Sequence, residues 1–211
     1  MAAGGICVKV ELKPEPEQHK HFNAASNDNE RERAMQRLAA VLREDVCRQI
    51  EEIGAADVLV GIPSFNNART IGHVVRAAQA GLGKYFPACR AVLVNSADET
   101  MNTVRQASVD FNAVLVQNQA QPLHKILTPY VGLPGKGSAF RTVFEIARAL
   151  KVKACAVVDS DLRSITPEWF ELLLRPVLES GFDYVAPYYH RHKYDGTITN
   201  TIRSEERRVG K

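Results

Sequence analysis

The sequence predicts an α/β protein with a mostly parallel β-sheet that is covered by helices on both faces. Short apolar runs rich in β-branched residues alternate with amphipathic helical patterns from about residue 58 to residue 186. Such runs are typical of strands buried on both faces, and their alternation with helices is typical of parallel sheets. The composition, with 45% hydrophobic and 24% charged residues among 211, is that of a globular domain.

The predicted elements follow from the spacing of the apolar residues. Residues 1–29 are mixed and polar, and we expect them to form a flexible arm. From Glu30 the apolar residues recur three or four positions apart as far as Ile50, which predicts a helix that Gly54 would end. The same reasoning predicts strands at 58–63, 91–94, 113–116, 154–158 and 182–186, and helices at 71–82, 100–110, 138–150 and 167–178.

The chain is expected to hold one domain, residues 30–203, whose last part is incomplete. Residues 204–211 form a charged stub that does not continue the strand and helix pattern and resembles translated adapter sequence. We therefore expect a non-native tail at 204–211 and a natural protein that is longer than this chain.

Charge and composition exclude several classes of protein. The net charge is +3, and residues 203–211 carry four basic side chains against two acidic ones, so the rest of the chain is close to neutral. A nucleic-acid-binding protein would need a clustered basic face, and we expect no nucleic-acid partner. No apolar run reaches the ~18 residues of a membrane span, and the N-terminus lacks a signal-peptide pattern, so we expect a cytoplasmic protein. The sequence is compatible with a homodimer.

The four cysteines, Cys7, Cys47, Cys89 and Cys155, are widely spaced and form no Cys-x-x-Cys pair. That spacing fits neither a zinc site nor a redox pair. We interpret them as reduced and mostly buried thiols.

Two carboxylates follow the predicted strand at 154–158 directly. Asp159 and Asp161 flank Ser160, so both emerge at the carboxyl end of a buried strand, where such sheets bind ligands. Paired carboxylates can hold Mg²⁺ or Mn²⁺ while phosphate oxygens fill the remaining coordination positions. The alternative is a simple turn that caps the next helix.

A glycine-rich segment precedes the predicted helix at 138–150. Gly135 and Gly137 flank Lys136, and glycines at a helix N-terminus let the backbone N–H groups approach an anion. The lysine adds a full positive charge, so the segment is suited to phosphate. It lacks the spacing of a Walker loop, which argues against a P-loop NTPase. The alternative is an ordinary Gly/Pro turn with a solvated lysine.

Two further strand ends carry short polar side chains. Pro63, Phe65 and Asn66 follow the strand at 58–63, and Ser96 and Asp98 follow the strand at 91–94. Polar groups here could bind a base or ribose, and Phe65 could pack on a ring. Each loop alone is explained by turn chemistry, since Asn, Asp and Ser favour turns. The argument for a binding site therefore depends on all four segments meeting at one edge of the sheet.

The polar and aromatic segment 188–197 begins what we interpret as an acceptor region, with Tyr189 and Arg191 as candidate acceptor contacts. His190 and His192 could bind a phosphorylated acceptor or complete a metal site. The alternative is a solvated basic loop.

Together these segments resemble a known family. The runs Ile-Pro-Ser-Phe-Asn-Asn, Asn-Ser-Ala-Asp-Glu-Thr, Leu-Pro-Gly-Lys-Gly-Ser-Ala and Val-Val-Asp-Ser-Asp-Leu, within about residues 57–200, are similar to the GT-A (Rossmann-like) glycosyltransferases that use nucleotide sugars. The resemblance is to the glucosyl-3-phosphoglycerate synthase and mannosylglycerate synthase type. It implies a metal-dependent Asp-x-Asp motif and a nucleotide-binding half.

The resemblance also implies roles for individual residues. Those that would contact the nucleotide sugar are Pro63, Phe65, Asn66, Ser96, Asp98, Gly135, Lys136, Gly137, Asp159 and Ser160. Asp159 and Asp161 would hold the metal, Asp161 and Lys136 would serve catalysis, and Gly196 and Thr199 would join Tyr189 and Arg191 around the acceptor.

Two positions depart from the family pattern: Asn67 stands where relatives usually carry glutamate, and Thr197 stands where the phosphoglycerate enzymes have arginine. A histidine that completes the metal site in those enzymes lies far downstream of the motif, beyond the end of this chain.

The expected activity is transfer of a hexose from a nucleotide diphosphate sugar, of the UDP-glucose or GDP-mannose type, to a small hydroxylated acceptor such as glycerate or phosphoglycerate, with Mg²⁺ or Mn²⁺. One alternative is a sugar-phosphate nucleotidyltransferase, which uses a similar sheet. The other is a nucleotide-sugar-binding fragment without catalysis.

Overall fold

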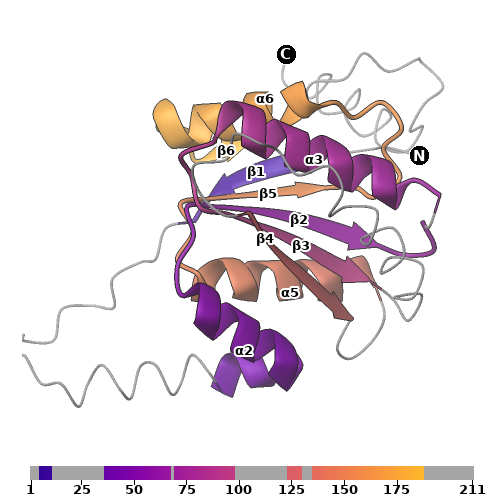
Figure 1. The fold of residues 1–211 in the computed structure, drawn as a ribbon, viewed down its shortest axis with the longest axis vertical. Coiled ribbons are helices and arrows are strands. Elements are labelled where there is room, and N and C mark those ends of the chain that lie inside the picture. Colours follow the sequence, from indigo (N-terminus) through magenta and orange to yellow (C-terminus); the bar gives the residue numbers. More distant parts are fainter. Residues whose placement is uncertain (1–4, 11–35, 68, 98–122, 130–134, 188–211) are drawn as a thin grey trace, which may run out of the picture.

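A computed structural model describes residues 5–10, 36–67, 69–97, 123–129 and 135–187 of the chain. Its centre is a six-stranded sheet with the order β4-β3-β2-β5-β1-β6 (Figure 1). The strands are β1 (Gly5–Lys9), β2 (Val58–Ser64), β3 (Ala91–Ala97), β4 (Leu123–Pro129), β5 (Ala154–Val158) and β6 (Tyr184–Val185). Strands β4, β3, β2 and β5 are mutually parallel, and β1 is antiparallel to both of its neighbours.

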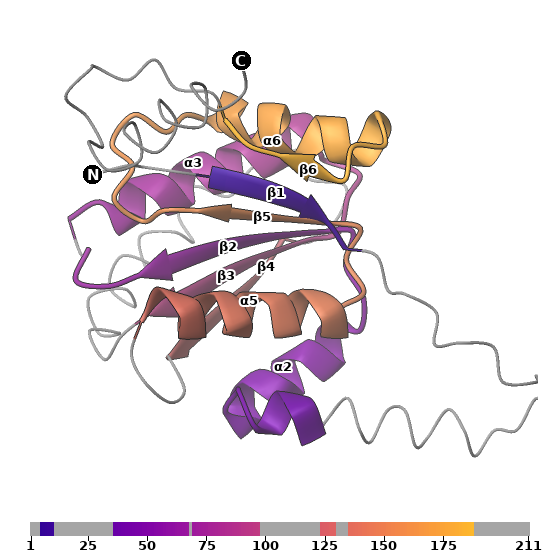
Figure 2. The ribbon, with the colours of Figure 1, turned by 180° about the vertical axis from the view of Figure 1, so that it is seen from behind.

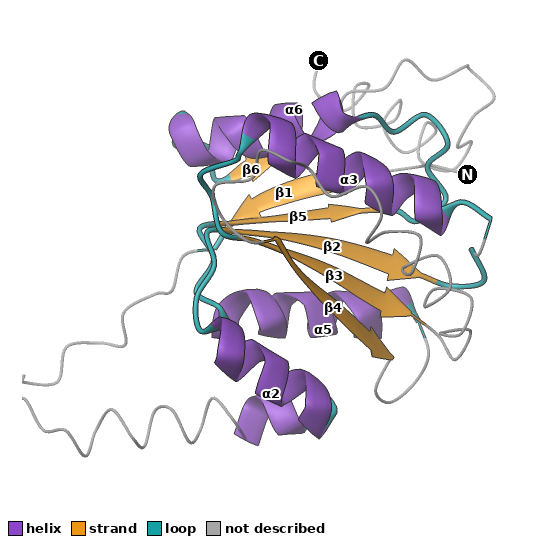
Figure 3. Ribbon diagram, viewed as in Figure 1, coloured by secondary structure: helices purple, strands orange, loops and turns teal. Residues whose placement is uncertain are grey.

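Helices cover both faces of this sheet. They are α2 (Glu44–Ile53), α3 (Ile71–Tyr85), α5 (Lys136–Ala149) and α6 (Pro167–Glu179). Helices α3 and α6 lie on one face, and α2 and α5 lie on the other, as the two opposite views show (Figure 1 and Figure 2). The predicted fold class, an α/β protein with a mostly parallel sheet and helices on both faces, is confirmed (Figure 3).

The order of the parallel strands defines a switch point. The chain passes outward from β2 to β3 and β4, and then returns to place β5 on the other side of β2. Strand β2 stays paired with β3 as far as Ser64, whereas its pairing with β5 ends at Gly61. In open sheets of this type ligands bind at the carboxyl ends of the strands that flank the switch point. Here those strands are β2 and β5.

The core consists of two apolar layers, one on each face, that follow the alternation of side chains along the strands. Val60 and Ile62 of β2 pack with α3 and α6, while Leu59 packs with α2 and α5. Position 61 requires glycine, because a Cβ there would lie 2.5 Å from Cγ1 of Val143 on α5. The glycine therefore allows α5 to approach the sheet closely.

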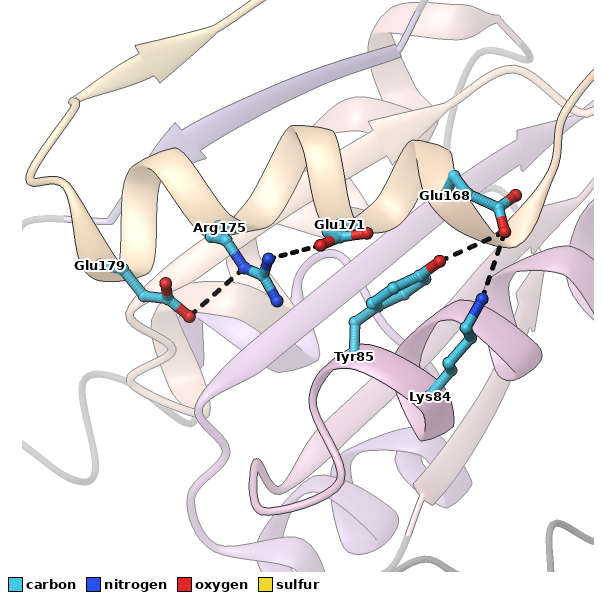
Figure 4. Close-up of polar contacts among 6 residues, drawn as sticks. All are labelled: Lys84, Tyr85, Glu168, Glu171, Arg175 and Glu179. Atoms are coloured by element: carbon cyan, nitrogen blue, oxygen red, sulfur yellow. Dashed lines mark hydrogen bonds and ion pairs between the residues drawn. The ribbon is translucent and has the colours of Figure 1, made fainter.

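The contact between α3 and α6 is extended by a polar cluster on the surface (Figure 4). Glu168 accepts hydrogen bonds from Tyr85 at 3.2 Å and from Lys84 at 3.4 Å. The pKa of Glu168 is lowered to about 2, first by a hydrogen bond from Thr166 and then by its own backbone amide and these two α3 residues. The cluster joins the C-terminus of α3 to the first turn of α6.

Two sequence predictions, the flexible arm at 1–29 and the sheet partner of β3, differ from the structure. The flexible arm predicted over 1–29 contains strand β1, because the short alternation from Gly5 to Lys9 fills the edge of β5 and buries Cys7. The sheet partner of β3 is β4, a segment that was not predicted. Its interior Lys125 and its terminal Pro129 hide the strand pattern. Within the described sheet β4 is the edge strand, where both residues are tolerated. The predicted strand at 113–116 and helix at 100–110 lie outside the described residues.

The helix predicted from Glu30 to Gly54 is interrupted. Residues 36–39 are helical, and Leu38 O then accepts hydrogen bonds from both Val41 N (2.9 Å) and Leu42 N (2.7 Å). This tightened turn ends at Arg43, whose extended backbone begins α2. The break allows the apolar residues before and after it to join one core layer, and α2 ends at Gly54 as predicted.

No helix within the described part of the chain is both long enough and apolar enough to cross a membrane.

Candidate functional site

The candidate site lies at the carboxyl ends of β2 and β5 and includes the first turn of α5. Residues 65–67 continue from β2, and the Asp159-Ser160-Asp161 turn continues from β5. Three of the four segments that the sequence singled out are thus brought together, and direct side-chain contacts join them. The fourth segment contributes Ser96 of β3, while Asp98 lies outside the described residues.

Ser160 links the β2 loop to the turn after β5. Asn67 Nδ2 donates a hydrogen bond to Ser160 Oγ at 2.6 Å, and Thr70 Oγ1 donates one to the Ser160 carbonyl at 2.8 Å. Ser160 is 2% exposed and both bonds are partly buried, which makes them stronger than bonds in open water. The turn that carries Asp159 and Asp161 is therefore fixed to the start of α3. Sequence analysis assigned Ser160 to ligand binding, whereas its described hydrogen bonds are to the protein.

Asn66 sets the direction of the β2 loop. Its backbone φ is 53°, in the left-handed region that asparagine adopts more readily than most residues. This turn brings the Asn67 side chain to Ser160. Phe65, at 63% exposure, projects from the same loop into solvent, where a large aromatic ring is available for stacking.

Lys136 links α5 to the turn after β5. Its Nζ lies 2.6 Å from Asp159 Oδ1. The Lys136 side chain is 60% exposed, whereas that of Asp159 is 15% exposed, so an exposed ammonium pairs with a mostly buried carboxylate. Nζ also lies 5.8 Å from the centre of the Phe140 ring, one turn along the helix. The predicted phosphate-binding lysine is thus paired with the predicted metal ligand.

The glycines beside Lys136 are not explained by packing within the protein. A Cβ at Gly135 or Gly137 would meet nothing within 4 Å, and the Gly135 backbone is extended, a conformation open to any residue. The backbone at the start of α5 is therefore accessible from outside. Residues 135–137 are exposed, so an anion could approach this first turn, as glycines at a phosphate-binding helix terminus allow.

Ser96 supplies an additional polar group at the end of β3. Its side chain is 0% exposed, and its Oγ has no hydrogen-bond partner within the described part of the protein. The register places it beside Pro63 of β2. Burying a hydroxyl without a partner costs about 1–3 kcal/mol, so such a group in this position is suited to a ligand or an ordered water.

The residues at the end of β5 fit a divalent cation of the magnesium type only in part. Asp159 and half-buried Asp161 offer the carboxylate oxygens that Mg²⁺ and Mn²⁺ prefer. Within the described ranges, however, no three His, Cys, Asp or Glu side chains form a group that could hold a metal. A cation here would need further oxygen ligands, which phosphate groups or water can provide.

Thiol chemistry does not belong to this site. Cys155 lies four residues before Asp159, and burial raises the pKa of its thiol to about 12. Burial also raises the pKa of Cys7 to about 12. Both remain protonated near neutral pH and are unsuited to act as nucleophiles. All four cysteines are free, as the sequence predicted.

The remaining candidate residues lie outside the described residues. They are Asp98 and the acceptor contacts Tyr189, Arg191, Gly196 and Thr199, together with His190 and His192. Conversely, sequence reasoning missed Asn67 and Thr70 as structural partners of the Asp-Ser-Asp turn. An Asn–Asn pair followed by threonine at a helix start was the available signal, and it is explained equally well by turn chemistry.

Neither a protein-family model nor a curated protein sequence matches the chain.

Proposed function

We propose that the chain is the donor-binding part of a GT-A type glycosyltransferase. It would move a hexose from a nucleotide diphosphate sugar to a small hydroxylated acceptor with the help of Mg²⁺ or Mn²⁺. The observation that carries this proposal is the meeting of three segments at the switch point, where Asn67 contacts Ser160 and Lys136 contacts Asp159. A sheet of this topology binds nucleotides at that edge.

Each group in the site has a chemical role under this proposal. Asp159 and Asp161 would hold the cation, which would neutralise charge on the departing diphosphate. Lys136 and the N–H groups at the start of α5 would stabilise the same charge. Phe65 would pack on the nucleobase, and the buried Ser96 hydroxyl would hydrogen bond to the nucleoside.

The loop after β2 argues against the alternative of a sugar-phosphate nucleotidyltransferase. Such enzymes usually place a glycine-rich loop directly after the first parallel strand, whereas this loop reads Ser64-Phe65-Asn66-Asn67. In this loop the Phe65 ring is exposed, and the Asn67 side chain donates a hydrogen bond to Ser160.

Calorimetric titration tests the proposal. The protein is titrated with UDP-glucose, GDP-mannose, UDP, GDP and UTP, each with and without Mn²⁺. We expect one diphosphate nucleotide or its sugar to bind in a metal-dependent manner. Affinity should fall at least about tenfold in Asp159→Asn and in Asp161→Asn, the loss typical of a charge-assisted contact.

A matched control is Asp183→Asn, which removes an exposed aspartate paired with Lys9 at 3.5 Å, beside β1 and β6. This variant should bind as the unchanged protein does. If folded protein binds none of the nucleotides, or binds them equally well without the two aspartates, the proposal is wrong. Stronger binding of UTP than of any diphosphate would favour the nucleotidyltransferase instead.

A further inference from the structure

The ion pair between Lys136 and Asp159 occupies the two groups that the proposed function assigns to different ligands. Asp159 would serve the cation and Lys136 the anion, yet Nζ and Oδ1 lie only 2.6 Å apart. At that distance each group neutralises the charge of the other. Neither ligand can use its residue without disturbing the pair.

A divalent cation on Asp159 would compete directly with the lysine. Metal–oxygen distances to Mg²⁺ are about 2.1 Å, so a cation on Oδ1 would compete with the ammonium for that oxygen, and a cation on either oxygen would place two positive charges close together. This repulsion favours departure of the lysine from the carboxylate. An anion that draws Lys136 away would leave Asp159, which is only 15% exposed, without that counterion.

We propose that Lys136 is a built-in counterion that makes the site bind a cation and an anion together in preference to either alone. A cation arriving alone must displace the lysine, and so must an anion. When both arrive, the lysine is displaced once and moves to the anion. Each ligand therefore raises the affinity of the other, and by linkage the effect is reciprocal. The inference rests on the proposed function and identifies a metal-bound diphosphate as the ligand that the site favours.

The surroundings of Lys136 allow this movement. Lys136 is the first residue of α5, its side chain is 60% exposed, and a Cβ at either neighbouring glycine would meet open space. The ammonium can therefore swing from Asp159 toward an anion above the helix N-terminus without moving the backbone. The carboxylate, by contrast, is held in place, because Ser160 next to it is fixed by Asn67 and Thr70.

The inference predicts that one variant, Lys136→Met, changes the affinities for the cation and for the anion in opposite directions. In Lys136→Met, Mn²⁺ alone should bind more tightly, by about threefold to tenfold, because its competitor is gone. UDP should bind more weakly in the same variant, because it loses its cation partner. A lysine that merely supported the local structure would weaken both ligands.

The experiment measures free Mn²⁺ by electron paramagnetic resonance during titration of the protein, so it needs no enzymatic activity. Three further variants accompany Lys136→Met and the unchanged protein. Lys136→Arg keeps a positive charge beside Asp159 and should show no gain in Mn²⁺ affinity over the unchanged protein. Lys153→Met removes a comparable ion pair, with Nζ 2.8 Å from Asp57 Oδ1 at the opposite end of the sheet, and should leave Mn²⁺ affinity unchanged. Asp159→Asn in the Lys136→Met background should abolish the gain.

The outcomes separate this inference from the proposed function. If Mn²⁺ binds through Asp159 but Lys136→Met leaves its affinity unchanged or lowers it, the inference is wrong and the proposed function stands. If Mn²⁺ binding is absent in every variant, or does not depend on Asp159, the metal site is wrong and both fall. Thermal melting of each variant checks that the protein is folded, so that a loss of binding is not caused by unfolding.

Discussion

At the scale of single residues, the two asparagines after β2 have different roles. Asn66 matters for its backbone, which turns into the left-handed region at φ 53°. Asn67 matters for its side chain, which donates to Ser160 at 2.6 Å. The acceptor hydroxyl is buried, and its own residue separates the two candidate metal ligands. The Asn67 amide, together with Thr70, therefore positions both carboxylates through the turn between them.

We expect Asn67→Ala to lower the free energy of unfolding by about 1–2 kcal/mol, because it removes a partner from the buried Ser160 hydroxyl. The affinity for Mn²⁺ should fall as well, since the Asp159-Ser160-Asp161 turn loses its link to the β2 loop. Urea unfolding and Mn²⁺ titration measure the two effects. Asn66→Gly is the control, because glycine keeps the left-handed backbone and all side-chain contacts of Asn67.

Unchanged stability in Asn67→Ala would contradict the role given to this hydrogen bond. A loss of stability with full Mn²⁺ affinity would show that the bond stabilises the fold without positioning the carboxylates.

At the scale of elements, the placement of α5 depends on the absence of a side chain at Gly61. The helix presents Lys136 at the site, and Val143, two turns along, packs where a Cβ at position 61 would stand. This dependence could not be predicted from the sequence, because a glycine inside a strand pattern has several explanations. Only the packing of the helix on the sheet distinguishes among them.

Gly61→Ala should therefore destabilise the protein by about 1–3 kcal/mol, since the new Cβ would lie 2.5 Å from Val143 Cγ1 and α5 or the strand must shift. Val143→Ala removes the clashing atoms, so the double variant should be more stable than the sum of the two single effects predicts. Gly137→Ala, where a Cβ meets open space within α5, is the matched control and should not destabilise. Chemical unfolding of the four variants measures the coupling, and strictly additive effects would contradict it.

The elements that the sequence predicted correctly are those with a complete pattern of their own. Strands β2 and β5 are buried along their whole length, and α3, α5 and α6 each bury one face, so local spacing was sufficient. Strands β1 and β4 were missed because their formation depends on partners distant in the chain. Five residues from Gly5 to Lys9 carry little signal until β5 pairs with them. The same limit applies to the site. Each loop was identified from the sequence alone, but the contacts of Asn67 with Ser160 and of Lys136 with Asp159 could be seen only in the folded structure.

At the scale of the whole molecule, the site depends on a strand from the beginning of the chain. Strand β1 pairs with β5 along all five of its residues, from Gly5 opposite Val158 to Lys9 opposite Ala154. This pairing makes β5 an interior strand, flanked by β2 on its other side. Strand β1 also holds β6, and its Cys7 is fully buried in the layer beneath α3 and α6. Strand β5, which leads into Asp159, therefore lies between two strands, β1 and β2, that are distant from it in the sequence.

Deletion of residues 2–10 should lower the melting temperature by about 6–12 °C. The deletion exposes the edge of β5 and removes apolar burial worth about 3 kcal/mol, and in a chain of this size each kcal/mol corresponds to about 2–4 °C. Lys9→Ala is the control: it removes the surface ion pair with Asp183 at 3.5 Å but keeps the strand, so it should change the stability by less than about 0.5 kcal/mol. Circular dichroism melting curves measure both variants. An unchanged melting temperature after the deletion would mean that β5 is stable as an edge strand and that the site does not require β1.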